Sequence, residues 1–454
     1  MSHLTWGGSS CLELAERFGT PLYVLDEDVI RARCAEVRRS FLDRWHGSTA
    51  FYASKAFLTR AMARIVDQEG LGLDVVSLGE LHTALRAGFP PGRIELHGNA
   101  KSEEELRAAL SVGVGRIVVD GSMELDVLID LAERMGARAR ILIRVAPGVE
   151  ADTHAHIATG HEGSKFGVPL EGDVLPRMIH EAQASGCVEL MGLHSHVGSQ
   201  LFDPDDHVRA VERLVEAMAR LRGELGFEPR ELGLGGGFGA QISPDVPHVP
   251  LALFTDAMME ALSRGCAAHG LALPAASIEP GRWIVSEAGL SLYRIETVKE
   301  LPDVIYLAVD GGMSDNPRYA LYGARYRATL AERPDAPAHE QGRRVCIAGK
   351  CCESGDVLIE DARPLPHAGR GDVLAIFNAG AYTFSMASNY DRLGRPAVVL
   401  VGTGHEPEVI VERQSPEDLL RGDVIPARLA EDSEMSSTNE AERGGGGGCV
   451  RHAL

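Results

Sequence analysis

Between about residues 49 and 282, short apolar runs alternate with longer segments of helical periodicity, and this alternation constrains the fold more than any other feature. Each run is apolar where it begins and polar where it ends. A (β/α)8 barrel brings such strand ends to one mouth, whereas an open doubly wound sheet spreads them along a crevice, so we predict the barrel. The predicted strands are TAFYASK (49–55), LGLDVVS (71–77), RIELHGN (93–99), RIVVDG (116–121), RILIRVAP (140–147), VELMGLHSHVG (188–198), ELGLGGG (231–237) and AASIEPGR (275–282).

Downstream of about residue 285 the pattern changes to alternating β-type runs with turn residues and few long helical stretches. A chain of 454 residues is too long for one ordinary core, so two domains are expected. We predict an α/β protein with a TIM-like barrel over 26–284 and a C-terminal antiparallel β domain, of barrel or sandwich type, over 285–430. Residues 1–25 are expected to pack on the β domain. Residues 431–454 are polar and Gly-rich, which predicts a disordered tail.

Composition narrows the functional class. The net charge of -20 opposes binding to phosphate backbones, so nucleic acid is not expected as a partner. No apolar run approaches the roughly 20 residues of a membrane span, and the opening MSHLTWGGSS lacks the apolar core of a signal peptide. The eight cysteines are scattered, without the CxxC spacing of a zinc site. We therefore expect free thiols, no metal, no membrane partner and a cytoplasmic location.

Two of the predicted strands end in residues suited to a carbonyl-bearing pyridine cofactor. Lys55 directly follows TAFYAS, and a lysine amine partly desolvated at a barrel mouth has a lowered pKa and forms Schiff bases. Glu279, at the end of the last predicted strand, is a carboxylate that can keep a pyridine nitrogen protonated and make the ring an electron sink. A purely structural interpretation, in which Glu279 pairs with Arg282, stays open.

Glycines and histidines follow two other strands. The run LGLGGGFG (232–239) offers bare backbone NH groups for a phosphate, although glycine clusters also make ordinary tight turns. In HSHVGSQ (194–200), the histidine pair suits either a metal or stacking on an aromatic cofactor. A metal-binding barrel would carry the pair on its first strand, but here it lies on the sixth. We therefore favour stacking by His196 and a buried structural role for His194.

Three segments of the second domain are too rich in Gly, Asn, Ser and Tyr for core strands and are predicted to be loops that serve a site: 310–326, 352–358 and 378–390. Arg318 offers a planar fork for a carboxylate, and Glu353 offers a partner for an ammonium group. Cys352 is a candidate proton donor to a carbanion, although most single cysteines have no catalytic role.

Taken together, eight strings resemble the diaminopimelate decarboxylases, which are pyridoxal 5'-phosphate (PLP) enzymes, group IV decarboxylases of the alanine-racemase-like fold. The resemblance runs from about residue 20 to about residue 425 and implies a PLP barrel followed by a β domain. The strings, in family order, are YASKAF, HGNAKS, HSHVGSQ, GLGGGFG, EPGR, DGGMSDNPRYALYGA, CESGDVL and AGAYTFSMASNY.

The resemblance implies roles for individual residues. Lys55 would carry PLP, His196 would stack on its ring, Glu279 would pair with the pyridine nitrogen, and Cys352 or a water it orients would reprotonate the α-carbon. The other implied cofactor contacts are Ser199, Gly236, Gly237, Gly281, Arg282 and Tyr382, and the implied substrate contacts are Arg282, Arg318, Tyr322, Glu353 and Tyr382.

The implied activity is decarboxylation of meso-2,6-diaminopimelate to L-lysine and carbon dioxide, the last step of lysine biosynthesis. The resemblance also implies a homodimer with shared active sites, because the CESGD loop of this family reaches into the neighbouring subunit. Lys350 and Cys351 in GKCCESGD and Ala100 in HGNAKS depart from the family pattern, which leaves the exact diamino-acid preference open.

Three other classes of protein could share parts of this pattern. A decarboxylase of the ornithine or arginine type would share the barrel but usually has an Asp-containing loop after the cysteine. An alanine racemase would usually have an arginine in place of Glu279. A non-catalytic regulator would be expected to lose Lys55 or the phosphate glycines, and this sequence keeps both.

Overall fold

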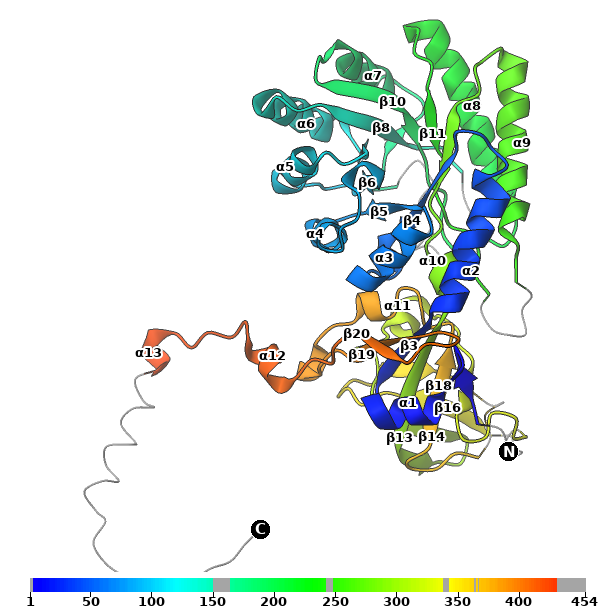
Figure 1. The fold of residues 1–454 in the computed structure, drawn as a ribbon, viewed down its shortest axis with the longest axis vertical. Helices are drawn as coiled ribbons and strands as arrows, with labels where there is room; N and C mark the ends of the chain where they lie inside the picture. The colour runs from blue at the N-terminus through cyan, green and yellow to red at the C-terminus, as the bar shows by residue number, and fades with distance from the viewer. Residues whose placement is uncertain are drawn as a thin grey trace, which may run out of the picture. The chain divides into compact units, whose positions relative to one another are not determined.

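The computed structural model describes residues 3–149, 164–241, 248–337, 343–362, 365 and 367–430. The predicted tail, 431–454, lies outside them. The described chain forms a closed parallel barrel and a second, mixed sheet (Figure 1). Two short helices, α12 (Pro416–Leu420) and α13 (Ala427–Ala430), belong to a separate C-terminal unit that begins at Gln414.

The barrel contains all eight predicted strands. Each pairs in parallel with the next, and β8 also pairs with β10 while β12 pairs with β4, so the sheet closes on itself. The prediction of a (β/α)8 barrel is therefore confirmed. Its strands are β4 (Thr49–Ala53), β5 (Gly72–Val75), β6 (Ile94–Leu96), β7 (Arg116–Val119), β8 (Ala139–Ala146), β10 (Val188–His194), β11 (Glu231–Gly233) and β12 (Ala275–Ile278), with β9 (Val168–Pro169) beside β8.

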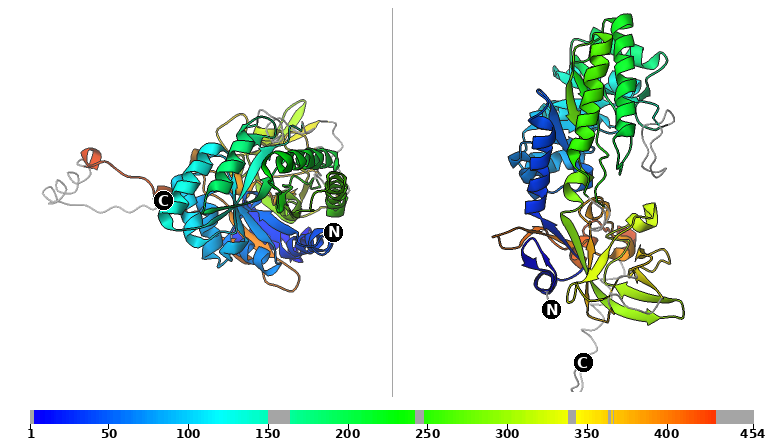
Figure 2. Two further views of the ribbon diagram at one scale, coloured as in Figure 1. Left: turned by 90° about the horizontal axis from the view of Figure 1, so that it is seen from above. Right: turned by 90° about the vertical axis from the view of Figure 1, so that its right-hand side faces the viewer.

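Helices surround the strands, as the two views of Figure 2 show. Several of these helices begin at a polar residue whose side chain accepts a hydrogen bond from a backbone NH of the first turn. Thr59 caps α3 in this way, Ser77 caps α4, and Ser102 forms a capping box with Glu105 on α5. The helices are α2 (Glu27–Val37), α3 (Arg60–Gln68), α4 (Leu78–Arg86), α5 (Glu103–Val112), α6 (Ser122–Met135), α7 (Val174–Ala184), α8 (Asp205–Leu225), α9 (Leu251–His269) and α10 (Arg282–Val285), and the π-helical turn η1 (Arg38–Leu42) extends α2.

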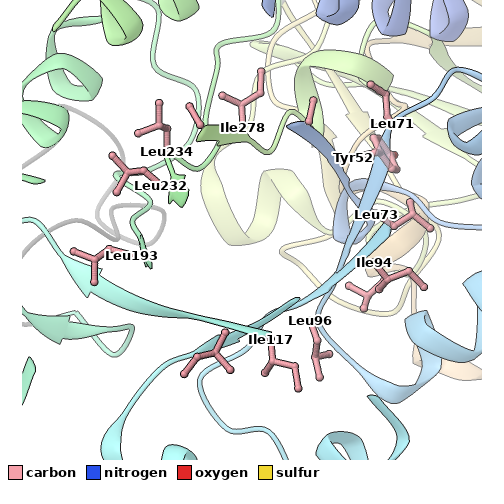
Figure 3. Close-up of a cluster of buried hydrophobic side chains, with 14 of the residues drawn as sticks. Tyr52, Leu71, Leu73, Ile94, Leu96, Ile117, Leu193, Leu232, Leu234 and Ile278 are labelled. Carbon is pink, nitrogen blue, oxygen red and sulfur yellow. The ribbon is translucent and has the colours of Figure 1, made fainter. Parts of the chain in front are cut away.

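The core of the barrel lies between strands and helices. Apolar side chains at alternate strand positions, such as Leu73, Ile94 and Ile117, belong to one large buried cluster (Figure 3). Burying a side chain of this size stabilises a fold by about 1.5–3 kcal/mol. The intervening positions face the barrel interior and include the fully buried acids Asp74 and Glu95. The interior of the barrel therefore contains buried charged side chains, in addition to apolar ones such as Phe51 and Leu142.

The β domain is a mixed sheet built around β13 (Gly289–Glu300), which pairs with β14, β18 and β3 along its length. β3 (Leu22–Asp26) precedes the barrel in the chain and lies between β13 and β19. It is antiparallel to β13 and parallel to β19. β14 and β16 are also parallel, so this sheet is less purely antiparallel than predicted. Its other strands are β14 (Val304–Val309), β15 (Ala328–Leu330), β16 (Arg344–Ala348), β17 (Val357–Ile359), β18 (Val373–Phe377), β19 (Ala397–Val401) and β20 (Glu408–Val411).

Smaller elements complete the described chain. The hairpin β1 (Thr5–Trp6) and β2 (Ser9–Ser10) leads into α1 (Cys11–Phe18), whose apolar face packs on the β domain. The loops of that domain contain α11 (Arg318–Tyr322) and single turns at Phe384–Met386 and Tyr390–Arg392. Every cysteine in the described ranges is a free thiol. None of the helices described has the length and apolarity to span a membrane.

Candidate active site

A cavity at the carboxyl ends of the barrel strands brings together most of the residues predicted to bind a cofactor. It lies where β4, β10, β11 and β12 end, next to the first turn of α10, and Tyr382 from the β domain contributes to its wall. Of the predicted residues, Lys55, His196, Ser199, Gly237, Glu279, Gly281, Arg282 and Tyr382 line this cavity.

Lys55 lies in a single helical turn, η2 (Ser54–Ala56), directly after β4. Its Nζ donates a hydrogen bond to Oδ2 of Asp74 on β5 over 3.2 Å. Burial lowers the pKa of the Lys55 ammonium, but Asp74, Tyr382 and Glu279 more than offset this, so the pKa is raised. The prediction of a lowered pKa was therefore wrong in this state of the protein, because the sequence did not reveal the acid beside the amine.

Glu279 is buried just after β12, and its partner is a histidine. Nε2 of His194 and Oε1 of Glu279 are 2.7 Å apart. Burial raises the pKa of Glu279, but the neighbouring His194, His97 and Lys55 outweigh it and hold the pKa well below its usual range. The open alternative, a Glu279–Arg282 ion pair, does not form among the described residues. His194, predicted to be only structural, contacts the key acid directly.

His196 is held against the glycine-rich turn. Its Nδ1 accepts a hydrogen bond from the backbone NH of Gly236 over 3.1 Å, so this nitrogen carries no proton. Burial, followed by the charges of Lys55 and Arg144, lowers the pKa of His196 well below its usual value. The ring is therefore neutral, and its orientation is fixed at the cavity wall.

The turn after β11 approaches other backbone too closely for any residue but glycine. A Cβ on Gly236 would lie 2.2 Å from the carbonyl oxygen of Glu279, and one on Gly237, where φ is +92°, would lie 2.1 Å from that of Gly198. Bare backbone at a strand end gives an anion close access to NH groups. These features, a lysine amine, a buried anionic carboxylate and a neutral imidazole around one cavity, fit PLP.

A second cavity adjoins the first and shares Arg282 with it. Arg282, Arg318 and Tyr322 all line this neighbour. The guanidinium carbons of Arg282 and Arg318 lie 4.5 and 5.7 Å from the ring centroid of Tyr382, so one aromatic ring connects the two arginines. Burial, with a smaller contribution from Arg318, lowers the pKa of Arg282 to about 10. In the described part of the chain neither arginine pairs with a carboxylate, which leaves two close cations facing a cavity.

Cys352 and Glu353 lie elsewhere. Both are exposed, and neither lines the two cavities of its own chain. The NH groups of Cys351 and Cys352 donate to carboxylates, that of Cys351 to Asp356 and that of Cys352 to Asp391, each over 2.7 Å. These bonds fix the backbone of the loop, in which Cys351 is buried while the side chains of Cys352 and Glu353 are at the surface. The single chain therefore does not bring the predicted proton donor to Lys55.

Sequence reasoning missed two acids beneath the cavity, Asp74 and Glu95, and it expected His97 at a strand end without giving it a role. The one available signal was an acid inside each of two short apolar strands, LGLDVVS and RIELHGN. His97, His194 and Glu279 place three potential metal-binding atoms within 4.8 Å of one another. Because the 2.7 Å contact uses the His194 nitrogen and the Glu279 oxygen for each other, we interpret the group as a hydrogen-bonded cluster.

Comparison with known proteins agrees with this geometry. Residues 27–286 match the family "Pyridoxal-dependent decarboxylase, pyridoxal binding domain". The chain is 46% identical to a diaminopimelate decarboxylase of Bacillus methanolicus over 91% of this chain and 94% of the relative, and 45% identical to that of Bacillus subtilis over 93% and 95%.

A solved structure has the same fold. The crystal structure of diaminopimelate decarboxylase from M. jannaschii in complex with L-lysine is 33% identical, with a TM-score of 0.86 over 93% of this chain and 96% of that one. The matched domain covers the barrel with Lys55 and Glu279, and the full-length matches extend through the β domain, which contributes Arg318, Tyr322 and Tyr382. The chain thus belongs to the pyridoxal-dependent decarboxylases, in the diaminopimelate decarboxylase family.

Proposed function

We propose that this protein is a PLP-dependent carboxy-lyase that converts meso-2,6-diaminopimelate to L-lysine and carbon dioxide, the last step of lysine biosynthesis. The observation that carries the proposal is the pairing of two sites. Lys55 and Glu279 share a buried cavity suited to the cofactor, and Arg282 connects it to a cavity with two arginines, Arg282 and Arg318, which form no ion pair with an acid among the described residues. A substrate with a second carboxylate can react in the first cavity while it pairs with the arginines of the second.

The residues proposed to hold PLP surround the first cavity. Lys55 would bind its aldehyde carbon, His196 would stack on the ring, and Glu279 would keep the ring nitrogen protonated. The residues that would hold the phosphate are Ser199, Gly236, Gly237, Gly281, Arg282 and Tyr382. When bound, the cofactor supplies a conjugated electron sink for the electron pair released as the carboxylate departs.

The remaining steps belong to the chain's own side chains. Arg282, Arg318 and Tyr322 bind and orient the carboxylates of the substrate, and the Tyr382 ring lies within 6 Å of both guanidinium groups. Glu279 stays anionic throughout, because its neighbours hold its pKa low. Whenever the Lys55 amine is not bonded to the cofactor, its ammonium form has Asp74 as a partner. This hydrogen bond stabilises the lysine side chain between turnovers.

Cys352 and Glu353 are proposed to act across a homodimer. Both side chains are exposed and lie outside the cavities of their own chain, which suits a role in the partner's site. There Cys352, or a water it orients, donates a proton to the α-carbon, and Glu353 binds the distal ammonium group. The same proposal places the enzyme in the cytoplasm, as a small-molecule enzyme without nucleic-acid or membrane partners.

A decarboxylase of the ornithine or arginine type is the alternative on the same fold. Its substrates have no distal carboxylate to offer the Arg318 guanidinium. Two arginines that form no ion pair with an acid among the residues described therefore favour a substrate with a second carboxylate.

One assay tests the proposal. The purified protein is supplied with PLP, and carbon dioxide release is measured from meso-diaminopimelate, ornithine, arginine and lysine, with Lys55→Ala as the inactive control. We expect release from meso-diaminopimelate and a visible absorbance band that Lys55→Ala lacks. Release from ornithine but not from meso-diaminopimelate would overturn the substrate, and no release from any amino acid would overturn the activity.

A further inference from the structure

A buried group of titratable side chains lies next to the cofactor cavity, and three of its members, Glu95, His97 and His194, have no part in the function proposed above. Nε2 of His97, which follows β6, lies 3.1 Å from Oε1 of Glu95, 3.8 Å from Oδ1 of Asp74 and 3.8 Å from Oε1 of Glu279. The rings of His97 and His194 meet edge to face at 4.9 Å. These contacts join β5, β6, β10 and β12, so the group crosses the interior of the barrel.

Burying three acids so close together is costly unless a positive charge accompanies them. Asp74 and Glu95 have no exposed surface and Glu279 has 5%. Within the described ranges, Oε2 of Glu95 has no hydrogen-bond partner, and Oε1 has only the contact with His97. Lys55 neutralises one of these acids, Asp74, through a hydrogen bond. Arg116 pairs with Glu231, and Arg144 lies closest to Asp120, at 3.9 Å. Among the described residues, His97 is the cation within 4 Å of both Glu95 and Glu279.

We propose that His97 is a positioning residue which, as a buried cation among Glu95, Asp74 and Glu279, holds the Glu279 carboxylate charged and in place, while a neutral His194 donates the hydrogen bond that aims it. The inference rests on the proposed function, because it assigns Glu279 to the cofactor ring nitrogen. His97 touches neither the cavity nor the substrate, so it acts through Glu279.

The two histidines are suited to different roles. For His97, burial lowers the pKa, but Asp74, Glu279 and Glu95 outweigh it and raise the pKa. For His194, burial dominates and lowers the pKa. The charged groups that face the pair are Asp74 from β5, Glu95 from β6, Arg144 from β8 and Glu279, which follows β12. Lys55, which follows β4, acts on Glu279. A neutral His194 that donates through Nε2 leaves Nδ1 unprotonated, and that atom makes no hydrogen bond among the residues described.

The test uses the holoenzyme and readouts other than turnover. His97→Gln removes the charge and keeps a polar side chain, and His82→Gln, at an exposed position on α4, is the matched control. We measure the dissociation constant of PLP and the pH at which the visible band of the bound cofactor changes on acidification. His97→Gln is expected to weaken PLP binding about tenfold or more and to move the transition up by about one pH unit, because Glu279 loses its cationic neighbour and protonates earlier as the pH falls.

Variants of Glu95 show whether His97 acts through its charge or through its packing. In Glu95→Gln/His97→Gln the buried acid that His97 neutralised is also gone, so the transition should return at least halfway to the wild-type pH. Glu95→Gln alone removes an anion and frees His97 to act on Glu279, so it should move the transition in the opposite direction. This variant stays informative if His97→Gln does not fold.

Three results would overturn the inference: a His97→Gln enzyme within about twofold of wild type in PLP affinity, a double variant no closer to wild type than the single one, or a stoichiometric metal ion bound to the wild-type protein. A wild-type protein that binds no PLP would overturn the proposed function together with this inference. A wild-type protein that binds PLP and decarboxylates meso-diaminopimelate, beside an unaltered His97→Gln, would overturn this inference alone.

Discussion

The amine of Lys55 lies 3.2 Å from a carboxylate oxygen of Asp74, an acid without any exposed surface. The acid holds the amine in its protonated form, and only the unprotonated amine attacks an aldehyde. In the cofactor-free protein, Asp74 therefore opposes the attachment of PLP at neutral pH. The same contact orders the amine at the cavity.

Asp74→Asn should accelerate PLP attachment. Because Asp74 raises the pKa of Lys55, its removal lowers that pKa and increases the unprotonated fraction at any pH below it. We expect the rate of attachment to the apo-protein at pH 7 to rise about five- to tenfold, and its pH profile to move down by roughly one unit. Stopped-flow absorbance measures both. Asp130→Asn on the exposed face of α6 is the control, and a rate that is unchanged or lower at every pH would contradict the expectation.

Glu279→Gln should lower the rate of catalysis while leaving the cofactor bound. The amide still accepts the hydrogen bond from His194 but carries no charge to keep a ring nitrogen protonated. We expect kcat to fall by about 10²–10³-fold with little change in KM, while the visible band of the bound cofactor persists. Glu224→Gln, exposed on α8, should behave as wild type. A Glu279→Gln enzyme with more than about half of the wild-type kcat would exclude this role.

Arg318→Met should damage recognition of the distal carboxylate. Loss of a hydrogen-bonded charge pair costs about 1.5–3 kcal/mol, so KM for meso-diaminopimelate should rise about tenfold to a hundredfold with kcat within threefold. The preference for meso-diaminopimelate over lysine should shrink by the same factor, which steady-state kinetics with both substrates measures. Arg264→Met, exposed on α9, is the control. An unchanged ratio between the two substrates would show that Arg318 does not read the second carboxylate.

Exchange of subunits tests the shared site. Lys55→Ala and Cys352→Ala proteins, each inactive, are mixed under conditions that allow dimers to exchange. If Cys352 serves the partner's cavity, half of the mixed population carries one intact site, so activity should recover to about a quarter of wild type. Lys55→Ala mixed with itself is the control. Activity that stays at the sum of the two parents, with exchange confirmed by mass spectrometry, would place Cys352 in its own chain's site or in none.

Much of the barrel could be predicted from sequence, because buried parallel strands are short apolar runs and their polar ends converge. TAFYASK and AASIEPGR illustrate this, since β4 and β12 pair directly and bring Lys55 and Glu279 to one cavity. The placement of β3 between β13 and β19 could not be read from LYVLD, because its partners lie more than 260 residues downstream.

The charges and pKa shifts of the site could not be predicted from the sequence, for a related reason. The pKa of Lys55 depends on Asp74, and the charge of Glu279 depends on His194 and His97, and these neighbours meet only across the closed barrel. Likewise, a sequence motif does not say that Cys352 and Glu353 lie outside the cavities of their own chain. Periodicity identifies elements, but contacts between distant strands set the chemistry.

The central claim, that Lys55 bears the cofactor, has one direct measurement. The holoenzyme is reduced with borohydride, which fixes a pyridoxyl group to whichever lysine holds it, and is then digested and sequenced by mass spectrometry. The chain has five lysines, Lys55, Lys101, Lys165, Lys299 and Lys350, so the assignment is unambiguous. We predict stoichiometric labelling of Lys55 and none in Lys55→Ala. A label on another lysine, or no label on a protein that releases carbon dioxide from meso-diaminopimelate, would contradict the account.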